Sequence, residues 1–352
     1  MSDMTNAGDK VTIADVAKSA GVATSTVSRA LSRPGRVSET MRHKIVSVAN
    51  EMGYYPNPQA RSLKSGRTQN VALLIPDITN PFFFGLFRAT QAQARARGYL
   101  QFVVNTEESA GVEAAYLAEL GKSVDGVVLA ASRLSDEELT AAARTMPIVT
   151  INRDIPNVPS VIIDTPAAMV QALDHLVSLG HTSIAYMSGP ESSWSSRKRW
   201  RALQQAARTR RVRLHHLGPF APTVQAGAAA ADSAMATDVT GCIFFNDLLA
   251  IGSLQRFAER GLRVPQDLSV IGCDDIFGAD FCNPPLTTFA APIEQAGRLA
   301  TDMLMSVIQD RWGGRLAGGV EGRRHERLST YLTIRESTGP APATSGAWGL
   351  AR

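Results

Sequence analysis

Residues 12–31 read T-I-A-D-V-A-K-S-A-G-V-A-T-S-T-V-S-R-A-L and contain two short helical patterns on either side of Gly21. Thr12 and Asp15 have the spacing of a capping box at a helix start. Gly21 can adopt the left-handed backbone that ends a helix. Apolar residues three and four positions apart give the first helix one buried face. This pattern predicts a helix-turn-helix, which places its second helix in the major groove of DNA.

The second helix of this pattern carries short hydroxyl side chains and one arginine on its polar side. Short side chains let the helix approach the groove floor, and an arginine can donate two hydrogen bonds to guanine, for about 1–3 kcal/mol of discrimination. The same pattern also occurs inside larger helical cores, so the segment alone leaves that alternative open. The expected DNA-reading residues here are Thr12, Thr24, Ser25, Thr26, Ser28 and Arg29.

A further amphipathic pattern between Ser38 and Gly53 completes a three-helix domain, expected over residues 10–56 after a disordered tail at 1–9. The positive charge of the chain is concentrated here. The whole chain of 352 residues has a net charge of +4 and is 44% hydrophobic, which is a globular composition. Residues 1–70 contain ten Lys/Arg against five Asp/Glu, a surplus that suits contacts with phosphates.

Neither a signal peptide nor a membrane-spanning stretch is visible in the sequence. The first ten residues lack a basic start followed by an apolar core, and no run approaches the ~20 apolar residues that span a bilayer. We therefore expect a cytoplasmic protein with no membrane partner. Cys242, Cys273 and Cys282 lack metal-ligand spacing, so we expect free thiols and no bound metal.

Residues 57–69 are expected to be a hinge helix and linker between two parts of the protein. Pro56 and Pro58 end the preceding helix, and Gly66 ends the hinge helix. The residues between Pro58 and Gly66 allow about a turn and a half of helix, which is too short to be stable in water by itself. A conditional helix is therefore expected beside the DNA-reading domain.

Several ordered motifs together resemble the lactose-repressor (LacI) family of bacterial transcription regulators. They are residues 11–31, R-V-S-E-T-M-R at 36–42, G-Y-Y-P-N-P-Q-A-R-S-L-K-S-G-R-T at 53–68, P-D-I-T-N-P-F-F at 76–83, L-G-H at 179–181, F-F-N-D-L-L-A-I-G at 244–252 and V-P-Q-D-L-S-V-I-G-C-D-D at 264–275. The resemblance implies that Leu63 is a wedge that opens a base step in the minor groove. An apolar side chain flanked by cations also suits that role, although Leu63 could instead dock the linker on the neighbouring lobe. The hinge candidates for DNA binding are Asn57, Ala60, Arg61, Leu63 and Lys64.

From Val71 onward, short apolar runs alternate with helical patterns, which indicates βαβ units and mainly parallel sheets. The number of runs exceeds one modest sheet. We therefore expect, over residues 70–338, two doubly wound lobes like those of periplasmic sugar-binding proteins. Residues 313–327 are expected to be a loose loop, and residues 339–352 a flexible tail.

Ligands of open α/β sheets bind beyond the carboxyl ends of the strands, so the residues that come after each strand are candidate ligands. Carboxylates, amides and arginines there can bind hydroxyl groups, and an aromatic ring can stack on a sugar. Asn246 and Asp247 could instead only cap a helix, and the basic cluster at 197–201 could be a solvated face. The effector-binding candidates are Asp77, Asn80, Phe82, Arg153, Asn246, Asp247 and Asp274, joined by Arg197 and Phe220 on the resemblance.

We find no phosphate-binding glycine loop, nucleophile elbow or metal-ligand set, so no catalytic residue and no cofactor is expected. A sugar-processing enzyme with a fused DNA-binding head and an exported sugar-binding protein are the competing hypotheses. The favoured one is a homodimeric repressor of a carbohydrate-utilisation operon, bound to palindromic operator DNA and released by a small sugar-like effector. The alternative is a co-repressor-activated regulator that responds to a nucleoside or another metabolite. The segment after Ile334 has no leucine heptad, which favours a dimer over a tetramer.

Overall fold

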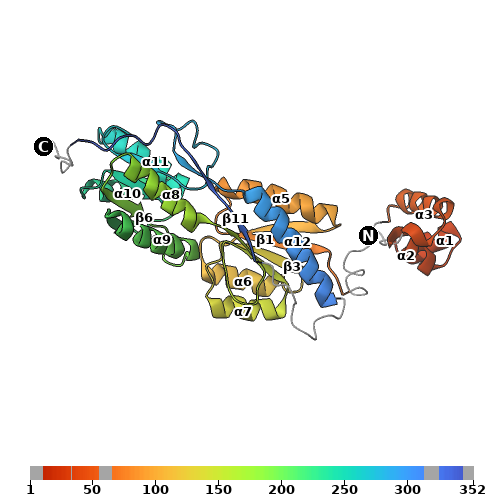
Figure 1. Cartoon of the computed structure of the whole chain (residues 1–352). Helices are drawn as coiled ribbons and strands as arrows, with labels where there is room; N and C mark the ends of the chain where they lie inside the picture. Colours follow the sequence, from red (N-terminus) through yellow and green to blue (C-terminus); the bar gives the residue numbers. More distant parts are fainter. Residues whose placement is uncertain (1–10, 33, 55–65, 313–324, 344–352) are drawn as a thin grey trace, which may run out of the picture. The chain divides into compact units, whose positions relative to one another are not determined.

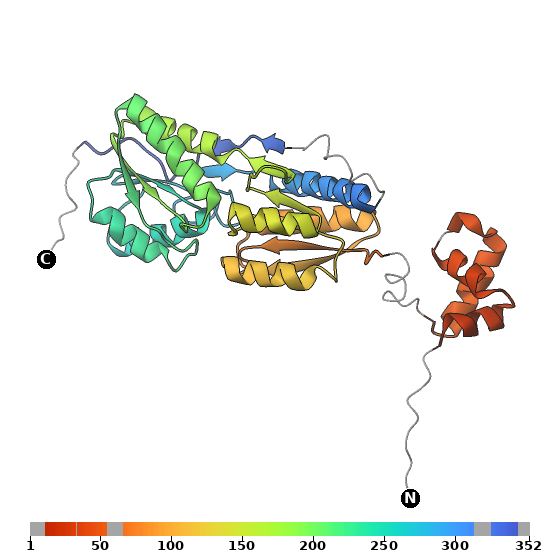
Figure 2. The same ribbon diagram turned by 90° about the horizontal axis from the view of Figure 1, so that it is seen from below.

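The computed structural model describes residues 11–32, 34–54, 66–312 and 325–343, shown in Figures 1 and 2. The chain divides into two compact units, Met1–Thr68 and Gln69–Arg352. The smaller unit is all-α and the larger is α/β. The expected fold class, a helix-turn-helix head and a two-lobed core with mainly parallel sheets, is confirmed.

The head contains α1 (Ile13–Ala20), α2 (Thr24–Ser32), the 3₁₀ turn η1 (Pro34–Arg36) and α3 (Glu39–Glu51). Thr12 and Asp15 form the predicted capping box: the Thr12 backbone N–H donates to Asp15 Oδ2 at 2.8 Å, and the Asp15 N–H donates to Thr12 Oγ1 at 3.4 Å. Gly21 ends α1 with a φ of 70°. Ser38 occupies the N-cap of α3, but its side chain makes no capping hydrogen bond. The apolar faces meet in one small core: Val16, Ala17, Ala20, Val27, Ala30, Ile45 and Ala49.

The first lobe of the larger unit, called here the N lobe, is a parallel six-stranded sheet in the order β11-β5-β4-β3-β1-β2. One face packs on α5 and α12, and the other on α6 and α7. Each face therefore has its own apolar core. The elements are β1 (Asn70–Ile75), α5 (Phe82–Ala96), β2 (Leu100–Asn105), α6 (Ala110–Leu120), β3 (Gly126–Ala130), α7 (Asp136–Thr145), β4 (Ile148–Ile151), β5 (Ser160–Ile163), α12 (Ile293–Trp312) and β11 (His325–Leu328).

The second lobe, the C lobe, is a parallel four-stranded sheet in the order β7-β6-β8-β9. Helices α8 and α9 cover one face, and α10 and α11 the other. In both sheets the order in which strands are added reverses beside the first strand, between β1 and β3 and between β6 and β8. Open α/β sheets bind ligands at such switch points. The elements are α8 (Thr165–Ser178), β6 (Ser183–Met187), α9 (Trp194–Arg210), β7 (Arg213–Leu217), α10 (Gly227–Met235), β8 (Gly241–Phe244), α11 (Asp247–Glu259) and β9 (Ser269–Ile271).

The chain crosses between the lobes three times. It passes from β5 to α8, returns between β10 (Thr288–Ala290) and α12, and passes back between β11 and β12 (Tyr331–Thr333). The two strands β10 and β12 pair antiparallel beside the C lobe. The N lobe is therefore built from two separate parts of the chain.

Two boundaries expected from the sequence are corrected by the structure. Residues 325–327, expected to be loop, belong to β11, which pairs with β5 and buries only Leu328. An edge strand with one buried side chain has almost no apolar signal. Residues 339–341, assigned to the flexible tail, are hydrogen-bonded to the C lobe: the Gly339 carbonyl is 3.1 Å from His181 Nε2, and the Ala341 N–H donates to Leu179 O at 2.8 Å.

Candidate DNA-reading helix and effector cleft

The polar face of α2 is presented to solvent, while its apolar face is in the head's core. Thr24, Ser25 and Arg29 are exposed, and Val27 and Ala30 are buried. Thr26 and Ser28 lie at the margin and are half-buried. The arrangement leaves two short hydroxyls and one arginine free of the core, which is the surface that a groove-reading helix needs. The hinge candidates Asn57, Ala60, Arg61, Leu63 and Lys64 lie outside the described residues.

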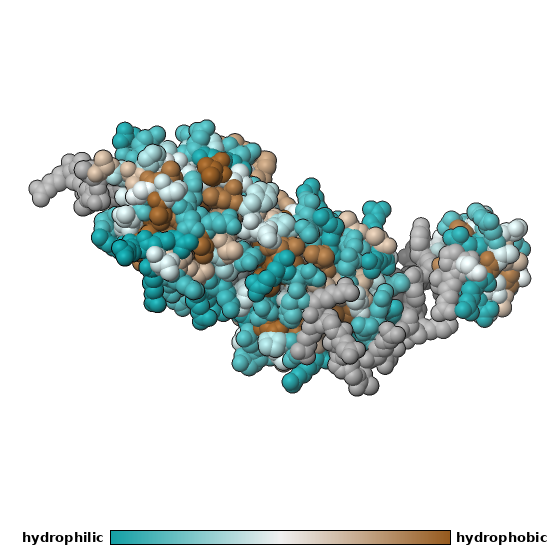
Figure 3. Space-filling model, in the orientation of Figure 1, coloured by the Kyte–Doolittle hydropathy of each residue, from teal (hydrophilic) through white to brown (hydrophobic). Residues whose placement is uncertain are grey.

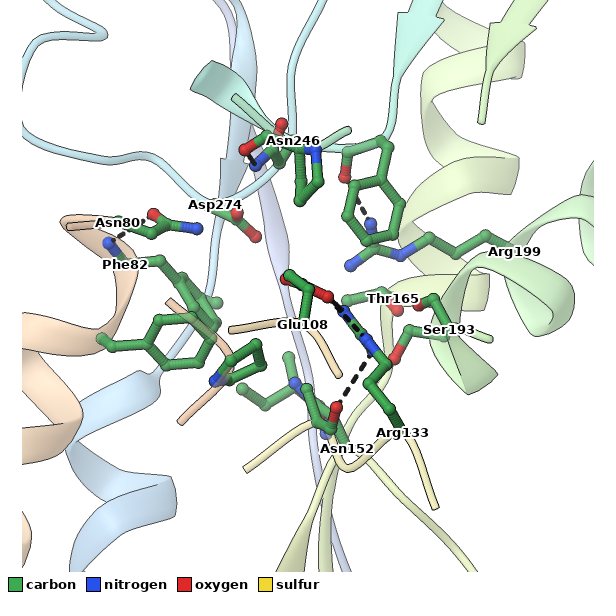
Figure 4. A pocket seen from close by; sticks show the side chains of 18 residues that line it. Asn80, Phe82, Glu108, Arg133, Asn152, Thr165, Ser193, Arg199, Asn246 and Asp274 are labelled. Atoms are coloured by element: carbon green, nitrogen blue, oxygen red, sulfur yellow. Dashed lines mark hydrogen bonds and ion pairs between the residues drawn. The ribbon is translucent and has the colours of Figure 1, made fainter. Parts of the chain in front are cut away.

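A cleft lies between the two lobes, and its lining comes from the carboxyl ends of strands in both sheets (Figure 4). The N lobe contributes residues at or after the ends of β1 to β5, and the C lobe those that come after β6 to β9; Ala291 comes after β10. The lining is Pro76, Asn80, Phe82, Phe83, Glu108, Ala131, Arg133, Asn152, Ile163, Thr165, Ser193, Ser195, Arg199, Pro222, Phe245, Asn246, Asp274 and Ala291.

On the N-lobe wall, Arg133 and Glu108 form a paired set of charges. The Glu108 Oε2 atom lies 2.6 Å from Arg133 Nε and 2.5 Å from Arg133 Nη2. A third guanidinium nitrogen, Nη1, donates to the Ala131 carbonyl at 3.0 Å. Beneath them, Ser132 Oγ and the Arg133 N–H donate to the buried carboxylate of Glu113, whose pKa is raised by burial. The Glu108–Arg133 pair on this wall therefore has no net charge.

On the C-lobe wall, Arg199 enters the cleft from the second turn of α9. Its Nη1 donates to the Phe245 carbonyl at 2.6 Å, and its guanidinium lies 5.2 Å from the centre of the Phe245 ring. Arg199 is 5% exposed, and its Nε has no hydrogen-bond partner. A buried N–H without a partner costs free energy. The guanidinium of Arg199 is therefore fixed against the C lobe with one N–H group unsatisfied.

Two aspartates of the C lobe, one beneath the cleft and one in its lining, occupy different environments. Asp247 is fully buried beneath the cleft, where Thr288 Oγ1 donates to it at 2.5 Å and the Ile276 N–H at 2.9 Å. Burial raises the pKa of Asp247 to about 6. Asp274 is half-buried in the lining, and the removal of water raises its pKa well above the usual range, although Arg199 opposes that shift.

Strained backbone is concentrated at the same strand ends. Glu108, Ala131, Asn152 and Asp274 come after β2, β3, β4 and β9, and their φ angles are 56°, 50°, 56° and 128°. Positive φ is costly for side chains other than glycine, and such strain tends to persist at ligand sites because it aims side chains that a relaxed turn would direct elsewhere.

Comparisons with known proteins agree with both halves of this geometry. The family profile "Bacterial regulatory proteins, lacI family" matches residues 12–57, and the "Periplasmic binding protein-like domain" profile matches residues 173–338. The regulator DegA of Bacillus subtilis is 34% identical over 342 residues, covering 94% of this chain and 99% of DegA. The repressor CytR of Escherichia coli is 32% identical over 339 residues, covering 94% and 97%. The chain belongs to the LacI family of bacterial transcription regulators.

Solved structures of similar fold agree with this assignment. The Lac repressor dimer bound to operator and an anti-inducer has a TM-score of 0.80 at 24% identity, covering 94% of this chain and all of that one. A regulator from Enterococcus faecium with bound ribose has a TM-score of 0.66 at 28% identity, covering 77% and 99%. The family consists of DNA-binding regulators, which confirms the expectation that this LacI-family protein is not an enzyme.

Within the part of the chain that the structure describes, no helix is long and apolar enough to cross a membrane. The same residues contain no cluster of histidine, cysteine and carboxylate side chains that could hold a metal ion.

Four of the predicted effector residues of this LacI-family regulator line the cleft: Asn80, Phe82, Asn246 and Asp274. Asn246 also caps α11, where its Oδ1 accepts from the Leu249 N–H at 3.0 Å. The capping alternative is thus also true of this residue, which faces the cleft at the same time. Their part in ligand binding stays a prediction.

The other five predicted residues are placed outside the lining. Asp77 accepts hydrogen bonds from Thr79, Phe220 packs on the C-lobe core, and Asp247 lies beneath the cleft. Arg153 is buried and donates to Leu134 O and Asp136 Oδ1, both at 2.7 Å. Arg197 is exposed and donates to Glu191 O at 2.7 Å.

The charged, polar and aromatic lining residues outside the predicted set are Phe83, Glu108, Arg133, Asn152, Thr165, Ser193, Ser195, Arg199 and Phe245. Of these, Asn152 comes directly after β4, where ligand residues were expected. For Arg199 a signal was available in the helical phase of α9. Ser196, Arg199 and Leu203 are three and four positions apart and form its buried face, whereas Arg197 falls on the exposed face. Glu108 and Arg133 each lie three residues beyond the end of their strand, so a search limited to the residues directly after the strands does not reach them.

Proposed function

We propose that the protein represses transcription by binding a palindromic operator as a homodimer, and that a small hydroxylated ligand in the cleft releases it. The observation that supports this most is the lining of one cleft by strand ends from both lobes. A ligand there contacts both lobes at once and can change their relative orientation. The side chains of Asn80, Asn152 and Asp274 suit hydroxyl groups, and the ring of Phe82 suits a sugar's C–H face.

In the DNA complex, Thr24, Ser25 and Arg29 would contact the bases. Thr12, Thr26 and Ser28 would contact the DNA at the margins of this surface. The hinge candidates Asn57, Ala60, Arg61 and Lys64 would contact the backbone, and Leu63 would wedge into the minor groove between the two heads. Coupling needs little energy, because about 1.4 kcal/mol changes affinity tenfold. Such a protein acts in the cytoplasm, where its operator is.

A dimer agrees with the apolar side chains exposed on both lobes of the larger unit, visible in brown in Figure 3. Exposed apolar groups of this size favour burial against a partner. A palindromic operator also needs two symmetric heads. The Lac repressor in its operator complex is a dimer. The proposed contact residues are Ile78, Phe84, Leu100, Phe102, Phe277 and Phe281.

The second candidate is a co-repressor that strengthens operator binding. The specific observation in its favour is the three aromatic rings in the lining, Phe82, Phe83 and Phe245, which could stack on a nucleoside base. A co-repressor would raise operator affinity, whereas an inducer would lower it, so one titration of operator binding with the ligand separates the two candidates.

The test is fluorescence anisotropy with palindromic duplexes taken from the promoters next to this gene, with and without candidate sugars and nucleosides. We expect tight binding to one palindrome and weaker binding with one ligand. Tighter binding with the ligand would favour the co-repressor, and equal affinity for palindromic and random DNA in all conditions would reject the function. Leu63→Ala should weaken specific binding far more than non-specific binding.

A further inference from the structure

The outer face of α9 carries a concentration of positive charge that belongs neither to the DNA-reading helix nor to the cleft. Residues 191–217 contain eight Lys/Arg against one Glu. The rest of the chain from residue 71 onward contains 18 Lys/Arg against 26 Asp/Glu, a net charge of −8. The larger unit is therefore acidic except for one strongly basic helix and the strand β7 that comes after it.

The helical phase of α9 places these cations on one side. Arg197, Arg201 and Arg208 are four and seven positions apart, so they form a narrow row along the helix, with Lys198 beside it. These four side chains, called here the basic row, are exposed, whereas Arg199 on the opposite side is buried. A helix rises about 1.5 Å per residue, so the row is about 16 Å long. In Figure 1, α9 runs along the lower margin of the C lobe.

No carboxylate in the part of the chain that the structure describes forms an ion pair with the basic row. The ion pairs of this segment are made by two other arginines, Arg210 and Arg213. Like charges four positions apart destabilise a helix, and cations in its first turns oppose its dipole. A face that only needs solvation usually mixes both signs of charge. The basic row therefore costs helix stability, and a bound polyanion would offset that cost.

The same surface lacks the large apolar side chains that a protein partner needs. Protein interfaces have an apolar core and are depleted in lysine, whereas the phosphates of a nucleic acid are bound by cations alone. Trp194 and Trp200 on α9 are half-buried, and the Lys198 ammonium group lies 5.3 Å from the centre of the Trp194 ring. The large apolar side chains exposed among the described residues lie on other elements: Ile78, Phe84, Leu100, Phe102, Tyr116, Phe277, Phe281, Tyr331 and Ile334. Charge without apolar surface favours a nucleic acid over an acidic protein.

Duplex DNA offers charge at a density that the basic row can match. It carries about one phosphate charge per 1.7 Å of its axis, so a row of about 16 Å runs along roughly five base pairs. Arginine suits this contact, because its planar guanidinium donates two hydrogen bonds to one phosphate. A LacI-family regulator also holds DNA close by through its head.

We propose that the basic row on α9 binds the phosphate backbone of duplex DNA without reading its sequence. It is a second DNA contact, separate from the recognition helix in the head and from the effector cleft. A molecule with both contacts can hold a further stretch of DNA while its heads are occupied, which goes beyond operator binding and release.

The first test is arginine footprinting of the full-length protein with an excess of duplex DNA of random sequence. Phenylglyoxal modifies exposed guanidinium groups, and mass spectrometry measures the rate at each arginine. We expect DNA to slow the modification of Arg201 and Arg208 severalfold, because phosphates cover them. Arg95 and Arg144, which are exposed on the N lobe, are the controls and should react at an unchanged rate. Equal rates at Arg201 and Arg208 with and without DNA would overturn the proposal.

The second test measures whether the full-length protein bridges a bead-bound random duplex and a second, labelled random duplex. The basic-row variant combines Lys198→Gln, Arg201→Gln and Arg208→Gln, and glutamine keeps a high helix propensity. The control variant combines Arg95→Gln, Lys122→Gln and Arg144→Gln, which removes the same charge from exposed positions of the N lobe. Since three phosphate contacts are lost, we expect the basic-row variant to need about tenfold more protein for equal capture, and the control variant to behave as the wild type. Equal capture by the two variants would overturn the proposal.

Poly-L-glutamate in place of DNA tests the alternative partner, an acidic protein. Protection of Arg201 and Arg208 by poly-L-glutamate but not by DNA would assign the basic row to such a partner and overturn the proposal. Equal protection by both at the same concentration of charge would show no preference for DNA and would overturn it too. Because the duplexes have random sequence, none of these outcomes depends on the operator or the effector. A failure here therefore leaves the proposed regulatory function standing.

Discussion

The recognition helix α2 and the effector cleft are both binding surfaces, but they are built in opposite ways. The face of α2 comes from nine consecutive residues, and its reading side chains are exposed on an ordinary helix. The cleft brings together residues between positions 76 and 291, most of them buried, several charged and four at positive φ. A surface that meets a long, regular polymer can be encoded locally. A surface that encloses a small molecule depends on the whole fold.

The largest expected effect is a loss of stability of the larger unit when the packing behind the cleft is disturbed. Gly252 on α11 touches the end of the loop before α10 so closely that a Cβ atom there would overlap the carbonyl oxygen of Val224. We expect Gly252→Ala to destabilise the larger unit by about 3 kcal/mol, because backbone cannot yield as a side chain does. Urea unfolding measures this. The control is Gly111→Ala in α6, where the nearest atom is 3.9 Å away and no loss is expected; equal losses would contradict the packing argument.

The buried charge beneath the cleft should appear as a dependence of stability on pH. The pKa of Asp247 rises from 3.8 to about 6 on folding, so its stabilising contribution is complete below pH 3.8 and is lost as pH rises through 6. This corresponds to about 3 kcal/mol between pH 4 and 7. Asp247→Asn cannot titrate, so the free energy of unfolding should fall less with pH in this variant than in the wild type. Parallel curves for the two proteins would show that Asp247 carries no such shift. The exposed Asp280→Asn is the control.

A change on the reading face of α2 should leave stability intact and alter only DNA binding. Arg29 is exposed, and α2 places it beside Thr24 and Ser25 on the polar face. Arg29→Ala should weaken operator binding by about 2 kcal/mol, roughly 30-fold, with sequence preference relaxed at one base pair. Anisotropy with single-base operator variants measures it. If affinity for all sequences fell equally, Arg29 would be a phosphate contact.

The smallest effect is expected at the start of α1. Thr12→Ala removes the hydroxyl that accepts from Asp15 N and donates to Asp15 Oδ2 at 2.7 Å. Its loss should cost about 1 kcal/mol of head stability. Thr12→Ser keeps the hydroxyl and serves as the control. Thermal unfolding monitored by circular dichroism tests both, and an unchanged midpoint in the alanine variant would show that the capping box contributes little.

The difference between local and long-range contacts also decides how much could be predicted from the sequence. The helices of the head could be predicted from residue spacing alone, because Thr12, Asp15 and Gly21 make their contacts within one helix. Most strands of the lobes follow from apolar runs, but β11 does not, since its pairing with β5 depends on residues far away in the chain. In the cleft, spacing identified residues directly after strands, such as Asn246. The Arg133–Glu108 pair and the choice of Arg199 over Arg197 depend on side-chain direction, which the fold fixes.

The three crossings between the lobes have a consequence for biosynthesis. Helix α12 and strand β11 complete the N lobe, packing on α5 and pairing with β5, yet they are translated after the whole C lobe sheet. As the chain emerges from the ribosome, the N lobe is therefore the first to appear but is completed only after the C-lobe sheet has been synthesised. Until then the apolar face of α5 that α12 covers stays exposed, and exposed apolar surface in a nascent chain favours aggregation and chaperone binding.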